Sequence, residues 1–463
     1  GQVPAAPQSE LLVTLARNVT GFMGCTGKVC TLSPKLTYFL ARLAACPFTF
    51  MEEATVHNKA ALSRRDLLKK GSTGLAALAI GPSLLAISQP LAARTLANIG
   101  ELQCPDANGM RLPAGFSSRV IAAAGQRVRR SFWNRTHYRW HSYPDGGATF
   151  ATPDGGWVYV SNSETISLLG GGAGAIRFHA DGSINDAYRI LGGTNINCAG
   201  GPTPWQTWLS CEEVDFGRVY ECDPFGARPA RVRRGLGYFK HEAAAVDPVF
   251  NMVYLTEDEG DGRFYRFIPA GHHHDGSLNL DKGILQVAAM DSQGYVEWLD
   301  LPNPTPNALQ APTREQLPQS GAFDGGEGCW YSHGFVYFTT KGDNKVWQLD
   351  TNLNRLTVVY DAATSTNPIL TGVDNLTVSS GGDLLVAEDG GDMQIVVIDT
   401  DGKGAPLLQV TGQDDSEITG PAFSPDGTRL YFSSQRGSDI FGGGNGFGIT
   451  YEITGPFQQF VTL

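Results

Sequence analysis

Residues 251–269 read NMVYLTEDEGDGRFYRFIP, and this stretch decides the fold class. Apolar residues alternate with polar ones in NMVYLTED and again in RFYRFIP, and a Gly- and Asp-containing turn separates the two runs. Alternation with a period of two is typical of antiparallel strands that bury one face. The stretch therefore predicts two strands joined by a turn, with acidic residues where the first strand ends.

The same arrangement recurs along the chain. Alternating runs begin at residues 157, 175, 207, 335, 345, 383, 394 and 429, and several adjoin Asp-Gly turns. Acidic residues end many of them, as in VSNSE, LSCEE and VAEDG. A pair of sandwiches or a β-helix would not explain carboxylates at corresponding strand ends. The repeat predicts an all-β fold, a β-propeller of five to seven blades, with the acidic strand ends at one face of its central channel.

The N-terminal region has a different composition. Residues 63–69 read SRRDLLK, and the apolar stretch LAALAIGPSLLAI follows. This combination is typical of a twin-arginine export signal. An amphipathic first helix would carry polar residues at helical spacing, and a membrane anchor would be longer and without Pro. We expect an upstream segment foreign to the natural product (residues 1–62), a signal peptide (63–93) and a propeller domain (94–463). The expected destination is the periplasm or the cell exterior, reached through the twin-arginine translocase.

The net charge of the chain argues against polyanionic partners. Beyond residue 93 the chain has 26 Lys and Arg residues against 42 Asp and Glu residues, a formal charge of −16. Nucleic acid and anionic membrane surfaces attract basic proteins, so neither is expected as a partner. An excess of carboxylates instead suits a protein that holds several hard cations.

Carboxylates at strand ends, with one cysteine among them, are the donor set of a mixed metal centre. Carboxylates suit calcium, and a thiolate selects a softer metal such as iron or zinc. Metal ions promote phosphate-ester hydrolysis because they neutralise phosphoryl oxygens and lower the pKa of bound water. The candidates are Cys198, Glu213, His241, Glu242, Glu257, Asp258, Glu327, Asp374, Asn375, Glu388 and Asp389.

Each candidate taken alone is more often structural. A strand-end acid is usually a solvated turn residue, and a lone Cys is usually a small buried apolar residue. Pairs of acids at successive strand ends are different, because they would bring like charges together in the channel. Only cations or protons relieve that repulsion.

Several phrases in order along the chain carry a family resemblance. PDGGATFATPDGGWVYVSNSE, NCAGGPTPWQTWLSCEE, HEAAAVDP, GEGCWY and VDNLTVSSGGDLLVAEDG resemble PhoX-type alkaline phosphatases. The resemblance implies a six-bladed propeller, a secreted phosphoric monoester hydrolase, a small phosphoester substrate and a cluster of two irons with two or three calciums. A monomer is expected.

The resemblance also implies roles for single residues. Iron or bridging ligands would be Cys198, Glu213, Glu242 and Glu327, and calcium ligands would be Asp258, Glu388 and Asp389. Asn162 would bind a phosphate oxygen, and together with Glu327 it would form the catalytic centre.

The chain departs from the family pattern at three positions. Gly325 stands where members usually carry an Arg that can form two hydrogen bonds to phosphate. Ser163 replaces a usual His, and Ile196 stands where an Arg often occurs. Arg177 or Lys240 could compensate.

These departures leave two other functions open. One is a propeller that binds calcium but no longer hydrolyses. The other is a calcium-dependent hydrolase of the lactonase type, which needs no thiolate.

Overall fold

The computed structural model describes residues 95–399, 402–437 and 448–460. Strands β1 to β28 and a few short 3-10 helices make up the secondary structure of this part, and it contains no α-helix. None of its helices is both long and apolar enough to cross a membrane. The predicted upstream segment (residues 1–62) and export signal (63–93) lie outside the described residues.

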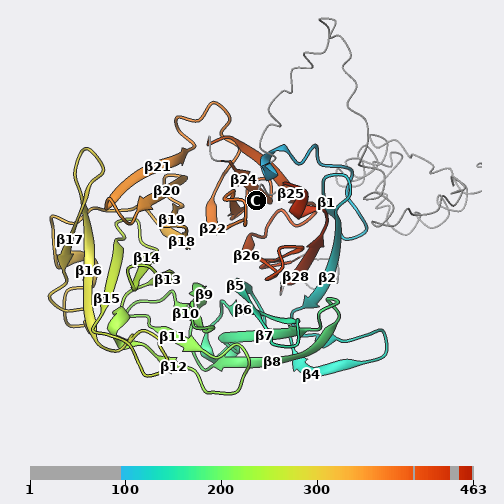
Figure 1. The fold of residues 1–463 in the computed structure, drawn as a ribbon, viewed down its shortest axis with the longest axis horizontal. Coiled ribbons are helices and arrows are strands. Elements are labelled where there is room, and N and C mark those ends of the chain that lie inside the picture. Colours follow the sequence, from blue (N-terminus) through green and yellow to red (C-terminus); the bar gives the residue numbers. More distant parts are fainter. Residues whose placement is uncertain (1–94, 400–401, 438–447, 461–463) are drawn as a thin grey trace, which may run out of the picture. The chain divides into compact units, whose positions relative to one another are not determined.

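Six antiparallel sheets, which we call blades 1 to 6, follow one another along the chain (Figure 1). Blade 1 contains β5 (Pro144–Ala151), β6 (Trp157–Ser163), β7 (Gly172–Phe178) and β8 (Ile184–Gly192). Blade 2 contains β9 (Asn197–Pro202), β10 (Trp208–Glu212), β11 (Val219–Cys222) and β12 (Arg231–Val232). Blade 3 contains β13 (His241–Asp247), β14 (Met252–Glu257), β15 (Phe264–Pro269), β16 (Gly283–Met290) and β17 (Val296–Asp300).

The last three blades complete the ring. Blade 4 contains β18 (Gly326–Ser332), β19 (Phe335–Thr340), β20 (Lys345–Asp350) and β21 (Arg355–Asp361). Blade 5 contains β22 (Val373–Val378), β23 (Leu384–Glu388), β24 (Gln394–Ile398), β25 (Gly404–Val410) and β1 (Met110–Arg111). Blade 6 contains β26 (Ile418–Phe423), β27 (Arg429–Ser434), β28 (Ile449–Thr454) and β2 (Ser117–Ala123).

Short elements connect or flank the blades. They are the hairpin of β3 (Arg127–Arg129) and β4 (Arg135–Arg139), and the 3-10 helices η2 (Leu96–Asn98), η3 (Ser167–Leu169), η4 (Arg234–Leu236), η5 (Thr313–Glu315) and η7 (Phe457–Phe460).

The innermost strands of the blades form a closed ring around the channel. Strands β5, β9, β13, β18, β22 and β26 each contact the next in this order, and β26 contacts β5 (Figure 1). The all-β, six-bladed propeller predicted for the chain is therefore confirmed.

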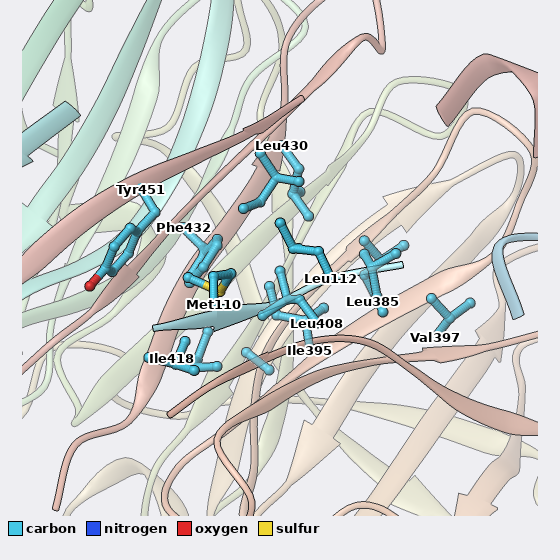
Figure 2. Packing of buried hydrophobic residues seen from close by; sticks show 14 of the residues in the cluster. Met110, Leu112, Leu385, Ile395, Val397, Leu408, Ile418, Leu430, Phe432 and Tyr451 are labelled. Atoms are coloured by element: carbon cyan, nitrogen blue, oxygen red, sulfur yellow. The ribbon is translucent and has the colours of Figure 1, made fainter. Parts of the chain in front are cut away.

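The N-terminal part of the domain closes the ring by adding outer strands to the last two blades. Met110 pairs with Val410 in blade 5, and Ser117 pairs with Thr454 in blade 6. Figure 2 shows Met110 and Leu112 packed among buried residues of both blades. Burying a Met or Leu side chain contributes about 1.5–3 kcal/mol, so these contacts hold the two blades together. They also cover two sheet edges that would otherwise be free to pair with other chains.

A register shift near the start of each innermost strand prepares the site. In blade 3, His241 pairs with Glu257 but Ala244 pairs with Leu255, so the inner strand has one residue more than its neighbour at this point. Blades 1, 2, 4 and 5 have the same irregularity at the corresponding place, and in blade 6 it lies one residue later, between Thr419 and Ala422. A bulge of this kind bends the strand and redirects side chains. Here it affects the second residue of the inner strand in blades 1 to 5, whereas Thr419 of blade 6 keeps a regular pair with Ser433.

Candidate metal centre

The second residues of the innermost strands, which we call the inner positions, bring most of the ligand atoms together. From blade 1 to blade 6 they are Asp145, Cys198, Glu242, Glu327, Asp374 and Thr419. Five of the six can bind a metal ion. Thr419 instead donates its hydroxyl to the carbonyl oxygen of Pro144 in blade 1.

A second set of residues, which we call the rim positions, directly follows the second strand of each blade. The first residue of every inner strand pairs with the residue before the rim position, which fixes the equivalence between blades. In blade order the rim positions are Glu164, Glu213, Asp258, Lys341, Asp389 and Gln435. Four are carboxylates, one is an amide and one is an ammonium group.

Among the described residues, three groups have ligand atoms within 4.8 Å of one another: Asp145, Glu164 and Cys198; Cys198, Glu213 and Glu242; and Glu242, Glu327 and Asp374. Every member is an inner or a rim residue. Cys198 and Glu242 each belong to two groups, so neighbouring cations could share them as ligands.

Glu242 shows most directly that the cluster needs a cation. Its side chain is 0% exposed, and neither carboxylate oxygen has a hydrogen-bond partner in the described ranges of the chain. Burial raises the pKa of Glu242 well above its usual range, and the nearby Glu327 carboxylate raises it further. Buried polar groups are almost always hydrogen-bonded, and an unpaired buried carboxylate is strongly unfavourable. A bound cation would satisfy both oxygens, so the residues present fit a metal ion.

Burial also disfavours the charged form of three other groups in the cluster, Glu213, Glu327 and Cys198. Burial raises the pKa of Glu213 to about 7 and that of Glu327 to about 8. Burial also raises the pKa of the Cys198 thiol, and the carboxylates of Asp145 and Glu242 add to the effect. Such a thiol stays protonated unless a metal ion replaces its proton, because cations stabilise the thiolate.

Three basic side chains partly neutralise the acids. Lys240 Nζ lies 3.0 Å from Glu213 Oε1 and 3.2 Å from Asp258 Oδ2. Lys341 Nζ lies 2.7 Å from Glu327 Oε1 and 3.3 Å from Asp389 Oδ2.

Arg436 makes the third set of contacts, 3.2 Å from Glu417 and 3.9 Å from Asp389. Within the described part of the chain, no ion pair reaches Asp145, Glu164, Cys198, Glu242 or Asp374. Metal binding is therefore expected first at these residues, which have no direct ion-pair partner there.

Comparison with known proteins agrees with this site. A family model for the alkaline phosphatase PhoX matches residues 146–215 and 214–355, a region that includes Cys198, Glu213, Glu242 and Glu327. Over residues 146–355 the chain is therefore similar to the PhoX alkaline phosphatases. The family resemblance predicted from the sequence is thereby confirmed, and it favours the predicted enzyme class, a phosphoric monoester hydrolase.

A solved PhoX structure supports the propeller fold. The structure of Pseudomonas fluorescens PhoX in complex with vanadate, a transition-state analogue, has a TM-score of 0.64 at 18% identity, and the match covers 77% of this chain and 98% of that one. A protein from Bacteroides thetaiotaomicron has a TM-score of 0.46 at 9% identity, covering 73% and 76% of the two chains. A gluconolactonase from Xanthomonas campestris has a TM-score of 0.42 at 13% identity, covering 77% and 98%. Comparison with curated proteins found no match.

The structure brings together four of the residues predicted from the PhoX resemblance. Cys198, Glu213, Glu242 and Glu327 all belong to the three groups of ligand atoms. Asp258 and Asp389 lie at rim positions, where Lys240 and Lys341 contact them. They adjoin the groups without belonging to them.

Glu388 lies outside the cluster. Its carboxylate accepts hydrogen bonds from the backbone N–H groups of Thr371 and Gln394, at 2.9 and 3.0 Å. Glu212 and Glu257 occupy the corresponding place in blades 2 and 3 and also accept from backbone N–H groups. We call Glu212, Glu257 and Glu388 the flank acids. Their side chains hold loops, whereas the next residue in each case is a rim acid.

Asn162, predicted to bind phosphate, is fully buried and has four protein partners. Its amide donates to the carbonyl oxygens of Cys198 and Ala199 and accepts from Trp208 and Ser210. In blades 3 and 4 the equivalent side chains make similar links. Thr256 donates to the Glu327 carbonyl, and Thr339 donates to the Asp374 carbonyl, both at 2.6 Å.

Asn162 thus resembles other links between a blade and the inner residue of the next blade. The NH2 group and the oxygen of its side-chain amide both already make hydrogen bonds in that network.

Sequence reasoning missed Asp145 and Glu164. Asp145 was hidden in the phrase PDGG, which is typical of a turn but forms the start of β5. Glu164 stands in VSNSE at the place where Glu213 stands in LSCEE. Alignment of the repeated phrases could therefore have identified it. Gln435 donates its amide to both carboxylates, at 2.6 Å to Asp145.

Proposed function

We propose that this chain is an exported phosphomonoesterase whose metal centre, with iron beside calcium, lies at the inner and rim positions. The observation that carries the proposal is the group formed by Cys198, Glu213 and Glu242. A thiol there lies beside two carboxylates, and neither Glu242 oxygen has a hydrogen-bond partner among the residues that the structure describes. A thiolate among carboxylates favours a transition metal over calcium alone.

The three groups of ligand atoms suggest where the ions would lie. Cys198, Glu213 and Glu242 would hold a transition metal, and Asp145 and Glu164 could extend that site through Cys198. Glu242, Glu327 and Asp374 contain only carboxylates, which suits a harder cation. When bound, the ions would supply the positive charge that neutralises phosphoryl oxygens.

The protein residues contribute position and charge. The inner strands fix the ligands on a rigid ring, so little reorganisation is needed when a substrate binds. Lys240, Lys341 and Arg436 keep positive charge at the rim, with side chains 27%, 36% and 44% exposed. This exposure leaves them accessible to an anion that approaches from solvent.

A metal analysis combined with an assay tests the proposal. Purified protein, loaded with iron and calcium, is assayed on p-nitrophenyl phosphate, and its metal content is measured by elemental analysis. We expect turnover together with bound transition metal, and loss of both in Cys198→Ala. Cys222→Ala is the matched control, because Cys222 is another buried free cysteine of blade 2 that lies outside the cluster.

Two results would contradict the proposal. If the wild-type protein binds the metals but shows no turnover, the proposed phosphatase activity is wrong. If elemental analysis finds calcium but no transition metal, the alternative of a calcium-binding propeller without hydrolytic activity is favoured.

We also propose that the chain leaves the cytoplasm through the twin-arginine translocase. The support is the phrase SRRDLLK and the apolar stretch that follows it. A full-length chain should be found outside the cytoplasm, and replacement of Arg64 and Arg65 by Lys should retain it inside. If the double variant is exported at the wild-type level, the proposed transport by the twin-arginine translocase is wrong.

A further inference from the structure

We propose that Lys341 is a substrate-binding residue whose ammonium group contacts a phosphoryl oxygen of the phosphomonoester. The inference rests on the proposed function for the nature of the substrate. Its own support is the place of Lys341 among the rim positions, the contacts of its Nζ atom and its exposure to solvent.

The rim positions define what is unusual about Lys341. Strand register makes Lys341 of blade 4 equivalent to Glu164, Glu213, Asp258 and Asp389 of other blades, because Gly326 pairs with Thr340 as the other first inner residues pair with the residues before these acids. At this position a carboxylate can bind a cation. An ammonium group cannot, because Lys is positively charged at neutral pH and offers only donors. Blade 4 therefore presents an anion-binding group where four blades present cation-binding groups.

The contacts of Lys341 place this charge beside the candidate metal ligands. Its Nζ lies 2.7 Å from Glu327 Oε1, and Glu327 belongs to a group with Glu242 and Asp374. The second contact is Asp389 Oδ2, at 3.3 Å. An ammonium group has three donors, so two protein partners leave one N–H for a ligand.

Exposure distinguishes Lys341 from a buried counter-ion. The Glu327 side chain is 2% exposed, whereas that of Lys341 is 36% exposed. The Lys341 side chain therefore links the buried cluster to the part of the site that solvent reaches. A phosphate monoester has several anionic oxygens, so one oxygen could contact Lys341 while others face the metal groups.

Phosphate-binding measurements on Lys341 variants test the inference independently of turnover. Inorganic phosphate and vanadate are titrated into metal-loaded wild type, Lys341→Met, Lys341→Gln and Lys341→Arg in a calorimeter. We expect the two uncharged variants to bind about tenfold to a hundredfold more weakly, the usual range for one charge-assisted hydrogen bond. Lys341→Arg should recover most of the affinity, because it keeps the charge and the donors. The Michaelis constant for p-nitrophenyl phosphate should rise in parallel.

A control variant and a metal analysis separate this role from a structural one. Lys345→Met removes another Lys of blade 4, whose Nζ lies 2.8 Å from Asp343, and it should leave phosphate affinity unchanged. Each variant is analysed for metal content and melting temperature. The inference requires that Lys341→Met and Lys341→Gln keep the wild-type metal content. If both lose metal together with phosphate affinity, Lys341 is a structural counter-ion and the inference is wrong.

The outcomes also separate this inference from the proposed function. Wild-type protein that binds phosphate through Lys341 without hydrolysing the ester would contradict the phosphatase and leave the inference standing. Hydrolysis with phosphate affinity within about twofold of wild type in both uncharged variants would overturn the inference alone. Failure of the metal-loaded wild type to bind phosphate or vanadate would overturn it as well.

Discussion

Glu388 and Asp389 are neighbours in the sequence, yet their carboxylates lie in two different regions of the molecule. Glu388 is 0% exposed and accepts hydrogen bonds from two backbone N–H groups of its own blade. Asp389 faces the rim, where Lys341 and Arg436 contact it. The same division separates Glu212 from Glu213 and Glu257 from Asp258. Successive residues of an extended segment point to opposite sides, so each acidic pair supplies one structural group and one site group.

The difference shows how a cluster of like charges can persist in a stable fold. The flank acids receive hydrogen bonds that the protein itself supplies, and they hold the loops of the blades in place. The inner and rim acids receive few such bonds, and Glu242 receives none from the part of the chain that the structure describes. The inner and rim acids are stabilised instead by the basic side chains of Lys240, Lys341 and Arg436 and by metal ions bound from solution. The following variants test this division.

Glu242→Gln should have the largest effect. It should weaken metal binding but raise the melting temperature of the metal-free protein. Loss of a ligand shared by two groups should weaken transition-metal binding by at least about a hundredfold, because even outer partners of metal ligands often contribute tenfold to a hundredfold. The metal-free variant should melt at a higher temperature than metal-free wild type, because an unpaired buried carboxylate is removed. Competition with a chelator and thermal denaturation measure the two quantities. Unchanged metal affinity would show that Glu242 is not a ligand.

Asn162→Ala extends the comparison to a buried group whose hydrogen bonds are satisfied. We expect the free energy of unfolding to fall by about 2–4 kcal/mol, because the indole of Trp208 and two carbonyl groups lose their partner in the interior. Urea denaturation measures the change. A stable variant with weakened phosphate binding would instead support the role in substrate binding implied by the family resemblance.

Much of this architecture could be predicted from the sequence, because it depends on local patterns. Period-two alternation identified the strands, and acids at strand ends indicated a common face of the channel. Alternation shows that two adjacent acids point to opposite sides of a strand, but it does not show which side faces the channel. For this reason Glu388 and Asp389 could not be told apart. The bulges of the inner strands could not be foreseen either, and Asp145, which lies at one of them, resembled a turn residue.

Local sequence patterns also could not predict how the ring closes. Met110 pairs with a residue three hundred positions away, Val410. Pairing over such a distance depends on the whole fold. The place of Lys341 among the acids likewise becomes visible only when the registers of the six blades are compared.

Glu388→Ala and Asp389→Asn compare the flank and the rim within one acidic pair. Glu388→Ala should lower the free energy of unfolding by about 1–3 kcal/mol, because two backbone N–H groups lose their acceptor, while metal content stays unchanged. Asp389→Asn should change it by less than about 1 kcal/mol, since its ion pairs are partly exposed. Denaturation and elemental analysis of the two variants provide the comparison. A loss of calcium in Glu388→Ala would support the calcium-ligand role implied by the family resemblance and would contradict the division.

The smallest effect concerns pH. Burial raises the pKa of Glu213 to about 7 and that of Glu327 to about 8, from an ordinary value of 4.5. Between these values the folded, metal-free protein binds more protons than the unfolded chain, so its free energy of unfolding should fall as the pH rises. The flank acids Glu257 and Glu388, whose pKa values burial also raises to about 7, contribute in the same direction.

Bound metal separates the two sets of acids in this pH dependence. Cations keep the inner and rim carboxylates ionised, so metal-loaded protein should retain only the part that comes from the flank acids. Melting temperatures of both forms between about pH 5 and pH 8 should therefore diverge as the pH rises, with the metal-free form lower. Parallel profiles would mean that Glu213 and Glu327 do not exchange protons for metal, and the distinction between satisfied flank acids and metal-dependent site acids would then be lost.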